Sequence, residues 1–217
     1  VEEDRTIIRE ARAAVISNSK TVPHITMGHS LLARLQQDSG DFVAARKEAL
    51  AGRNAFPTSI GGQRCNHLVA SIESSDFTLQ SMSSDGVQKR SMQISHRNVK
   101  AVHFRAYAVP VYEWLGRARD YNLLPSSDEA IRLVRSQKPA SSWSIELPET
   151  TDFNSHLTYT TPPMSEMGLY VVVASDRSNF DDSEAQIRAI VIQISDLVLL
   201  SAPTELGGSE VSVKNGM

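Results

Sequence analysis

The sequence is poor in cysteine: Cys65 is the single one among 217 residues. One cysteine excludes a disulfide within the chain and a zinc cluster built on thiolates. It leaves the compartment open, because a chain with a large core needs no disulfides outside the cytosol. Cys65 lies beside Leu68 and Val69 on the apolar side of an expected helix. We therefore expect a buried, inert thiol rather than a nucleophile.

Excess positive charge and long apolar runs are absent as well. Lys and Arg number 22 against 25 Asp and Glu, which gives a formal net charge of -3 at pH 7. Such a chain lacks the basic footprint that nucleic acid phosphates require, so no nucleic acid partner is expected. The longest apolar run, 189–200, is interrupted by Gln193, Ser195 and Asp196. It is far shorter than the roughly 20 apolar residues of a membrane span, so we expect no transmembrane segment.

Sequence motifs that carry chemistry are also missing. The glycine pairs 61–62 and 207–208 lack the spacing and the following Lys-Ser or Lys-Thr of a phosphate-binding loop. No Gly-x-Ser-x-Gly elbow supports a nucleophilic serine, and the acidic loop 176–184 lacks the glycine turn and terminal Glu of an EF-hand. The histidines are scattered, without an H-x-x-x-H or H-x-H pair to hold a metal: His24, His29, His67, His96, His103 and His156. We therefore expect no catalytic residue, no cofactor and no metal, and predict that the chain is not an enzyme.

Residues 1–75 carry apolar side chains at three- and four-residue intervals, the spacing of amphipathic helices. Asp41 is a suitable N-cap for one of them. Helices are expected over 2–17, 25–37, 41–56 and 61–73. A set of small residues resembles a tetratricopeptide (TPR)-type hairpin, in which paired helices approach closely: Ala33, Gly40, Ala45 and Ala49. An unrelated helical hairpin is the alternative.

From Phe77 onward the apolar spacing changes to two, which is typical of half-buried strands. No βαβ pattern separates the strands, so the sequence predicts an antiparallel β-sandwich over 76–202 and an α+β fold class. The strands are expected over 77–80, 92–95, 102–107, 143–147, 157–161, 169–174 and 187–195. Residues 203–217 are interpreted as a linker and the start of a following, truncated domain.

A partly helical insertion is expected at about 111–140, with Ser127-Asp128-Glu129 as a helix-start signal. It either serves a function or covers one edge of the sandwich. The candidate partner contacts lie in its first part, because exposed aromatic side chains mark interaction surfaces: Tyr112, Trp114 and Tyr121.

Five further stretches carry a family resemblance: 56–65, 96–99, 102–107, 168–176 and 194–197. Together they resemble the amino-terminal region of bacterial alpha-2-macroglobulin-like proteins. In these large exported chains a helical repeat-like segment can precede macroglobulin β-sandwiches of the immunoglobulin or fibronectin kind. The resemblance implies a place in a proteinase trap. The family's thioester motif, Cys-x-x-Gln, is absent, since Cys65 is followed by Asn66, His67 and Leu68. A non-catalytic structural or interaction segment is therefore expected.

The resemblance also implies an exported chain, which is periplasmic, membrane-anchored through an upstream lipid signal, or extracellular. Its expected partners are other domains of the same parent chain, with proteinases or envelope proteins as further candidates. The alternative is a stand-alone helical-repeat and β-sandwich adaptor that binds peptides or glycans.

Overall fold

The structure is a computed structural model of an α+β chain. It describes residues 6, 9–10, 13–14 and 24–215 except 82–90, 118–123, 182, 184, 196 and 204–206, with the backbone alone at 117, 197–199 and 215. The helix expected over 2–17 lies largely outside the described residues. Two compact units divide the chain: Val1–Asp76 with Glu149–His156, and Phe77–Pro148 with Leu157–Met217.

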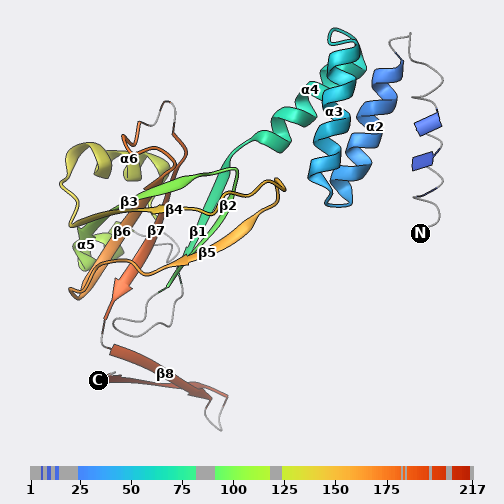
Figure 1. Ribbon diagram of the computed structural model, residues 1–217. Coiled ribbons are helices and arrows are strands. Elements are labelled where there is room, and N and C mark those ends of the chain that lie inside the picture. The colour runs from blue at the N-terminus through green and yellow to red at the C-terminus, as the bar shows by residue number, and fades with distance from the viewer. Residues whose placement is uncertain are drawn as a thin grey trace. The chain divides into compact units, whose positions relative to one another are not determined.

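From residue 24 onward the first unit contains the α-helices α2 (Ile25–Asp38), α3 (Phe42–Ala55) and α4 (Ile60–Glu73), which pack side by side (Figure 1). Asp41 caps α3 by accepting a hydrogen bond from the Ala44 amide at 2.9 Å, as the sequence predicts. Ser59 caps α4 in the same way, through the Gly62 amide at 3.0 Å. α3 and α4 therefore each begin at a side chain that satisfies one of the free N–H groups of the helix, whereas the side chain of His24, before α2, makes no such bond.

Small residues let these helices approach closely. The side chains of Ala33, Ala45, Ala49 and Cys65 are fully buried. A Cβ atom at Gly52 would lie 2.5 Å from the Cys65 Sγ and 2.6 Å from the His29 Cβ, so only glycine fits there. Gly40 has a different role from the one that the sequence analysis gave it. A Cβ atom there would meet nothing within 4 Å, and its φ is 83°, so this glycine forms the turn between α2 and α3 and does not lie at a helix contact.

Two β-sheets form the body of the second unit. The smaller has the strand order β1-β2-β5, with β1 (Asp76–Ser81), β2 (Met92–Arg97) and β5 (His156–Thr160). The larger has the order β4-β3-β6-β7, with β4 (Ser141–Glu146), β3 (Ala101–Val109), β6 (Gly168–Ser175) and β7 (Ile187–Ile194). Every neighbouring pair in the larger sheet is antiparallel, for example with Phe104 opposite Trp143 and Ala174.

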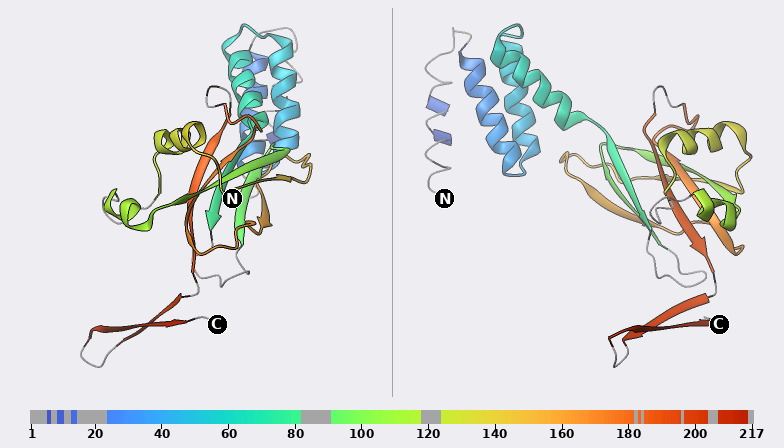
Figure 2. Two further views of the ribbon diagram at one scale, coloured as in Figure 1. Left: turned by 90° about the vertical axis from the view of Figure 1, so that its left-hand side faces the viewer. Right: turned by 180° about the vertical axis from the view of Figure 1, so that it is seen from behind.

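The larger sheet is covered on both faces. On one face, Phe104 and Val172 join Phe77 and Ile94 of the smaller sheet in one core. On the other face, a second core is closed by two helices, α5 (Val111–Arg117) and α6 (Ser127–Ser136), visible beside the sheet in Figure 2. Burial on both faces explains why the sequence of β6 is apolar without alternation. The described part of the insertion, α5 and α6, therefore packs on a face of the larger sheet.

The last two strands leave the sandwich. β8 (Leu197–Pro203) pairs antiparallel with β9 (Ser209–Asn215) in a separate two-stranded sheet, from Leu197 opposite Asn215 to Pro203 opposite Ser209. The sequence analysis placed residues up to 202 in the sandwich and interpreted 203–217 as a linker and the start of a following domain. The hairpin pairing instead joins both segments, and the change of sheet falls between β7 and β8.

Helix α6 begins at Ser127, and its cap lies one residue before the start signal that the sequence analysis placed at 127–129. Its N-cap is Ser126, whose side chain accepts from the Glu129 amide at 3.3 Å, while the Glu129 carboxylate accepts from the Ser126 amide at 2.9 Å. This reciprocal pair is a capping box. We expect Ser126→Ala to lower the free energy of unfolding by about 1 kcal/mol, measured by urea denaturation. Ser127→Ala is the matched control, and equal losses in both variants would contradict the cap.

Among the described residues, no helix combines the length and the apolar character needed to cross a bilayer.

Candidate functional site

The aromatic residues expected to contact a partner do not form one exposed surface. Tyr112 is 91% exposed, whereas Trp114 is only 9% exposed and belongs to the core between α5, α6 and the larger sheet. Tyr121 lies outside the described residues. The large apolar side chains exposed on the described part of α5 are Val111, Tyr112 and Leu115.

Cys65 is fully buried in the helical unit, as expected. Its Sγ lies 3.7 Å from the Thr26 carbonyl oxygen. Burial, with a smaller contribution from the negative charge of Glu48, raises the pKa of the Cys65 thiol from 9.0 to about 11. The thiol therefore stays protonated at neutral pH, and solvent does not reach it.

This raised pKa predicts a loss of stability in alkali. The folded protein holds the thiol proton of Cys65 more tightly than the unfolded chain does. The resulting stabilisation is complete below pH 9 and is lost as the pH rises towards 11. At pH 10 the loss should be on the order of 1 kcal/mol, because the thiol of the unfolded chain is then mostly ionised and that of the folded protein is not. Urea unfolding at pH 8 and pH 10 under reducing conditions measures it, with Cys65→Ala as the reference. The pH dependence should be flatter in Cys65→Ala, and parallel curves for the two proteins would contradict the prediction.

His29 and His156 each pair with a carboxylate in a different part of the chain. The His29 Nδ1 lies 2.6 Å from a carboxylate oxygen of Glu48, between α2 and α3, and the His156 Nε2 lies 2.9 Å from Asp152. The hydrogen bond from His156 lowers the pKa of Asp152, with further help from Asn154. Within the described part of the chain, no group of three or more His, Cys, Asp or Glu side chains is arranged to hold a metal ion.

The acidic loop 176–184 uses its described carboxylates for its own turn. Asp176 accepts from the Gln186 amide at 2.8 Å, and Asp181 accepts from the amide and the hydroxyl group of Ser183 at 3.0 and 2.8 Å. The bonds from Ser183 lower the pKa of Asp181. These oxygens stabilise a surface turn, while Asp182 and Glu184 lie outside the described residues.

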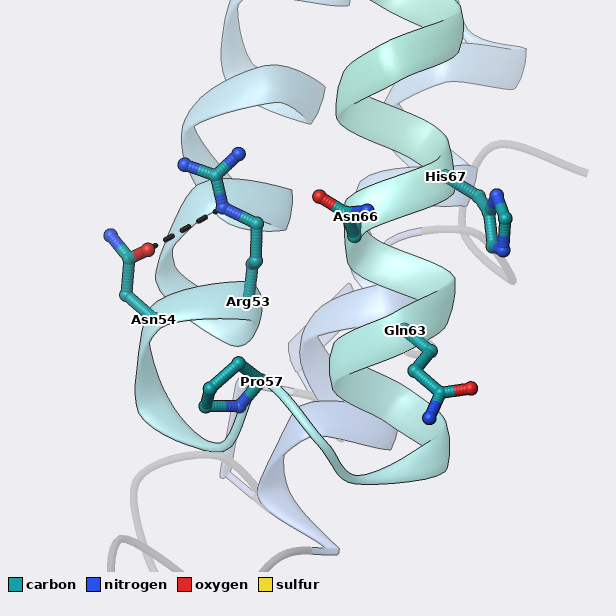
Figure 3. Close-up of a pocket in the computed structure, with 6 residues that line it drawn as sticks. All are labelled: Arg53, Asn54, Pro57, Gln63, Asn66 and His67. Carbon is teal, nitrogen blue, oxygen red and sulfur yellow. Dashed lines mark hydrogen bonds between the residues drawn. The ribbon is translucent and has the colours of Figure 1, made fainter.

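An open hollow of about 670 Å³ lies between α3 and α4 (Figure 3). Its lining comes from the end of α3, the connecting turn and the exposed side of α4: Arg53, Asn54, Pro57, Gln63, Asn66 and His67. Arg53 on α3 and Asn66 on α4 lie on the two sides of the gap, with the guanidinium of Arg53 turned towards Asn54, and His67 points to the other side of α4. We call this hollow the Arg53 pocket.

The turn before α4 positions these side chains. A Cβ atom at Gly62 would collide with the carbonyl oxygen of Phe56, so the chain folds back tightly only because that residue is glycine. Gln63 donates to the Thr58 carbonyl oxygen at 3.3 Å, which ties α4 to the turn. Asn66 is three residues further along α4 and therefore lies on the same side of the helix.

The electrostatics of the Arg53 pocket are positive. Its lining contains no Asp or Glu. The Nε of Arg53 lies 3.5 Å from the Asn54 Oδ1, and among the described residues Arg53 forms no salt bridge. A guanidinium group that is left without an anion can receive one from a ligand.

A second hollow of about 450 Å³ lies between α2 and α4, and His67 lines both. Leu31 and Leu68 contribute apolar surface to it, and Arg34 and Arg64 contribute positive charge. Arg34 is paired with Asp38 at 3.4 Å, while Arg64 contacts the sulfur of Met27 at 3.4 Å. We call this hollow the α2–α4 groove. The sequence analysis identified neither hollow, because no motif indicates which residues of neighbouring helices lie beside each other.

No protein family model, curated protein or solved structure matches this chain.

Proposed function

We propose that this chain is a non-catalytic structural and interaction segment of a large exported protein of the alpha-2-macroglobulin type. In this proposal the helical unit is a TPR-like segment, and the second unit is a macroglobulin-type β-sandwich. The resemblance of the sequence stretches named above supports the family, and the order of a helical unit before antiparallel sheets agrees with it.

The observation that carries the interaction role is the pair of adjoining hollows on the helical unit. Small-molecule sites are usually enclosed and mostly apolar. The Arg53 pocket is open, and most of the residues that line it are polar. The α2–α4 groove combines leucine with arginine side chains, a mixture typical of protein interfaces. A polypeptide that lies across α4 would reach both.

The second candidate is a stand-alone adaptor that binds peptides or glycans through the same helical unit. The gene sequence beyond Met217 separates the two. Further sandwich-patterned sequence with a Cys-x-x-Gln motif favours the macroglobulin-type parent, and a stop codon favours the adaptor.

The interaction role is tested by selecting a phage-displayed random peptide library on the isotope-labelled chain. We expect enriched peptides whose addition shifts the backbone amide resonances of α3 and α4. A selection without enrichment, or shifts confined to the second unit, would contradict the role assigned to the helical unit.

A further inference from the structure

We propose that the Arg53 pocket binds a side-chain carboxylate of an acidic polypeptide segment. This inference rests on the proposed interaction role of the helical unit and adds the chemistry of the partner.

The first support is the unused hydrogen-bonding capacity of Arg53. A guanidinium group has five N–H donors in a planar fork. Among the described residues its hydrogen bond, from Nε to the Asn54 Oδ1 at 3.5 Å, is at the long limit for such a bond. Most of the donors of Arg53 therefore remain available to a ligand that enters the pocket.

The second support is the amide of Asn66, which lies across the gap from Arg53. The Asn66 side chain projects from α4 towards α3, into the same space (Figure 3). A guanidinium with a carboxamide beside it can donate to both oxygens of one carboxylate, with geometry that a single ammonium group could not supply. One unpaired cation matches the single charge of a carboxylate better than the double charge of a phosphate group.

The third support is the distribution of charge. The chain as a whole is acidic, with a net charge of -3. The two hollows nevertheless place Arg53 and Arg64 near α4, in addition to Arg34, which is paired with Asp38, and no Asp or Glu lines either hollow. This local excess of positive charge favours an acidic segment over a neutral or basic one.

Because the Arg53 pocket is open, we expect it to bind the carboxylate of a side chain within a polypeptide rather than the terminal carboxylate of a chain. Pro57, Gln63 and Asn66 are all exposed, so a polypeptide can enter on one side and leave on the other. The ring of Pro57 offers an apolar wall to the methylene groups of a Glu side chain. A second carboxylate of the same segment would reach Arg64 in the α2–α4 groove, since His67 borders both hollows.

Fluorescence anisotropy with labelled twelve-residue peptides tests this. The probes alternate glycine with Glu, Gln, Lys or phosphoserine. We expect the Glu peptide to bind, the Gln and Lys peptides to bind at least about tenfold more weakly, and the affinity to fall with salt. Arg53→Gln should weaken the Glu peptide about tenfold, because charge-assisted hydrogen bonds are lost. Asn66→Ala should weaken it less.

Arg132→Gln, on the exposed side of α6, is the matched control for loss of one positive charge and should bind as the wild type does. Far-UV circular dichroism checks that each variant is folded. Equal binding of the Gln peptide, equal losses in Arg53→Gln and Arg132→Gln, or preference for the phosphoserine peptide would overturn the carboxylate site. Library peptides that bind α3 and α4 but carry no Asp or Glu would overturn it too, while leaving the proposed function intact.

Discussion

Replacing Gly61 with alanine is expected to lower the free energy of unfolding of the helical unit by about 3 kcal/mol, the upper end of the usual cost of overpacking. A Cβ atom at Gly61 would overlap the backbone nitrogen of Met27 and two atoms of Thr26. Two of these atoms belong to the α2 backbone and cannot move away by a change of rotamer. α4 would have to separate from α2 and lose the contacts of a closely packed interior.

Gly116 provides the matched control, because it lies in α5 and a Cβ atom there meets nothing within 4 Å. Gly116→Ala should be neutral or slightly stabilising, since alanine favours helix over glycine. Urea denaturation followed by far-UV circular dichroism reports the helical unit. Both tryptophans, Trp114 and Trp143, belong to the second unit, so their fluorescence should respond little to Gly61→Ala. An unchanged midpoint in Gly61→Ala would show that α2 and α4 are not in contact at this glycine.

The helices that the sequence predicts best are those with a local signal for both their start and their packing. Asp41 is followed by the small residues Ala45 and Ala49, and the structure has a capped helix there with both alanines buried. The apolar run of β6 is similarly informative, because burial on both faces leaves no polar position in the pattern. In both cases the local signal is itself the physical cause of the structure.

Trp114 shows where such reasoning fails. Four of the first five residues of α5 are apolar, so the pattern does not indicate which of them faces the sheet. The structure buries Trp114 and leaves Tyr112 in solvent. That choice depends on the second core formed with α6 and the larger sheet, and no periodicity within seven residues specifies it.

The strand β5 is a second element whose inward side cannot be predicted from its own sequence. Alternation alone would turn its large side chains, Leu157 and Tyr159, inward, but both are exposed. The cause lies on the neighbouring strand. His96 of β2 is buried and its Nε2 lies 3.0 Å from the Thr158 hydroxyl group, so β5 presents its polar side inward to satisfy an imidazole. The Arg53 pocket was missed for a related reason, because it depends on a turn that brings two helices together and not on any one segment.

Replacing Phe104 with alanine is expected to cost about 4 kcal/mol, within the usual range for truncating a buried aromatic residue. Phe104 is 1% exposed and lies on β3, in the core between the two sheets. Its ring stacks on Trp143 of β4, with the ring centroids 5.0 Å apart and the planes 10° apart. The substitution removes this contact and leaves a cavity that strands fixed on both sides cannot close.

Tryptophan fluorescence during urea denaturation measures the effect directly, because Trp143 is the stacking partner. Tyr112→Ala serves as the control for loss of an aromatic ring at an exposed position, where changes stay within about 0.5 kcal/mol. Phe104→Leu should fall between the two, since leucine refills part of the cavity. If Phe104 fills the core between the two sheets, the loss in the free energy of unfolding should increase with the side-chain volume that the substitution removes. A Phe104→Ala variant as stable as Tyr112→Ala would mean that the two sheets do not pack through this residue.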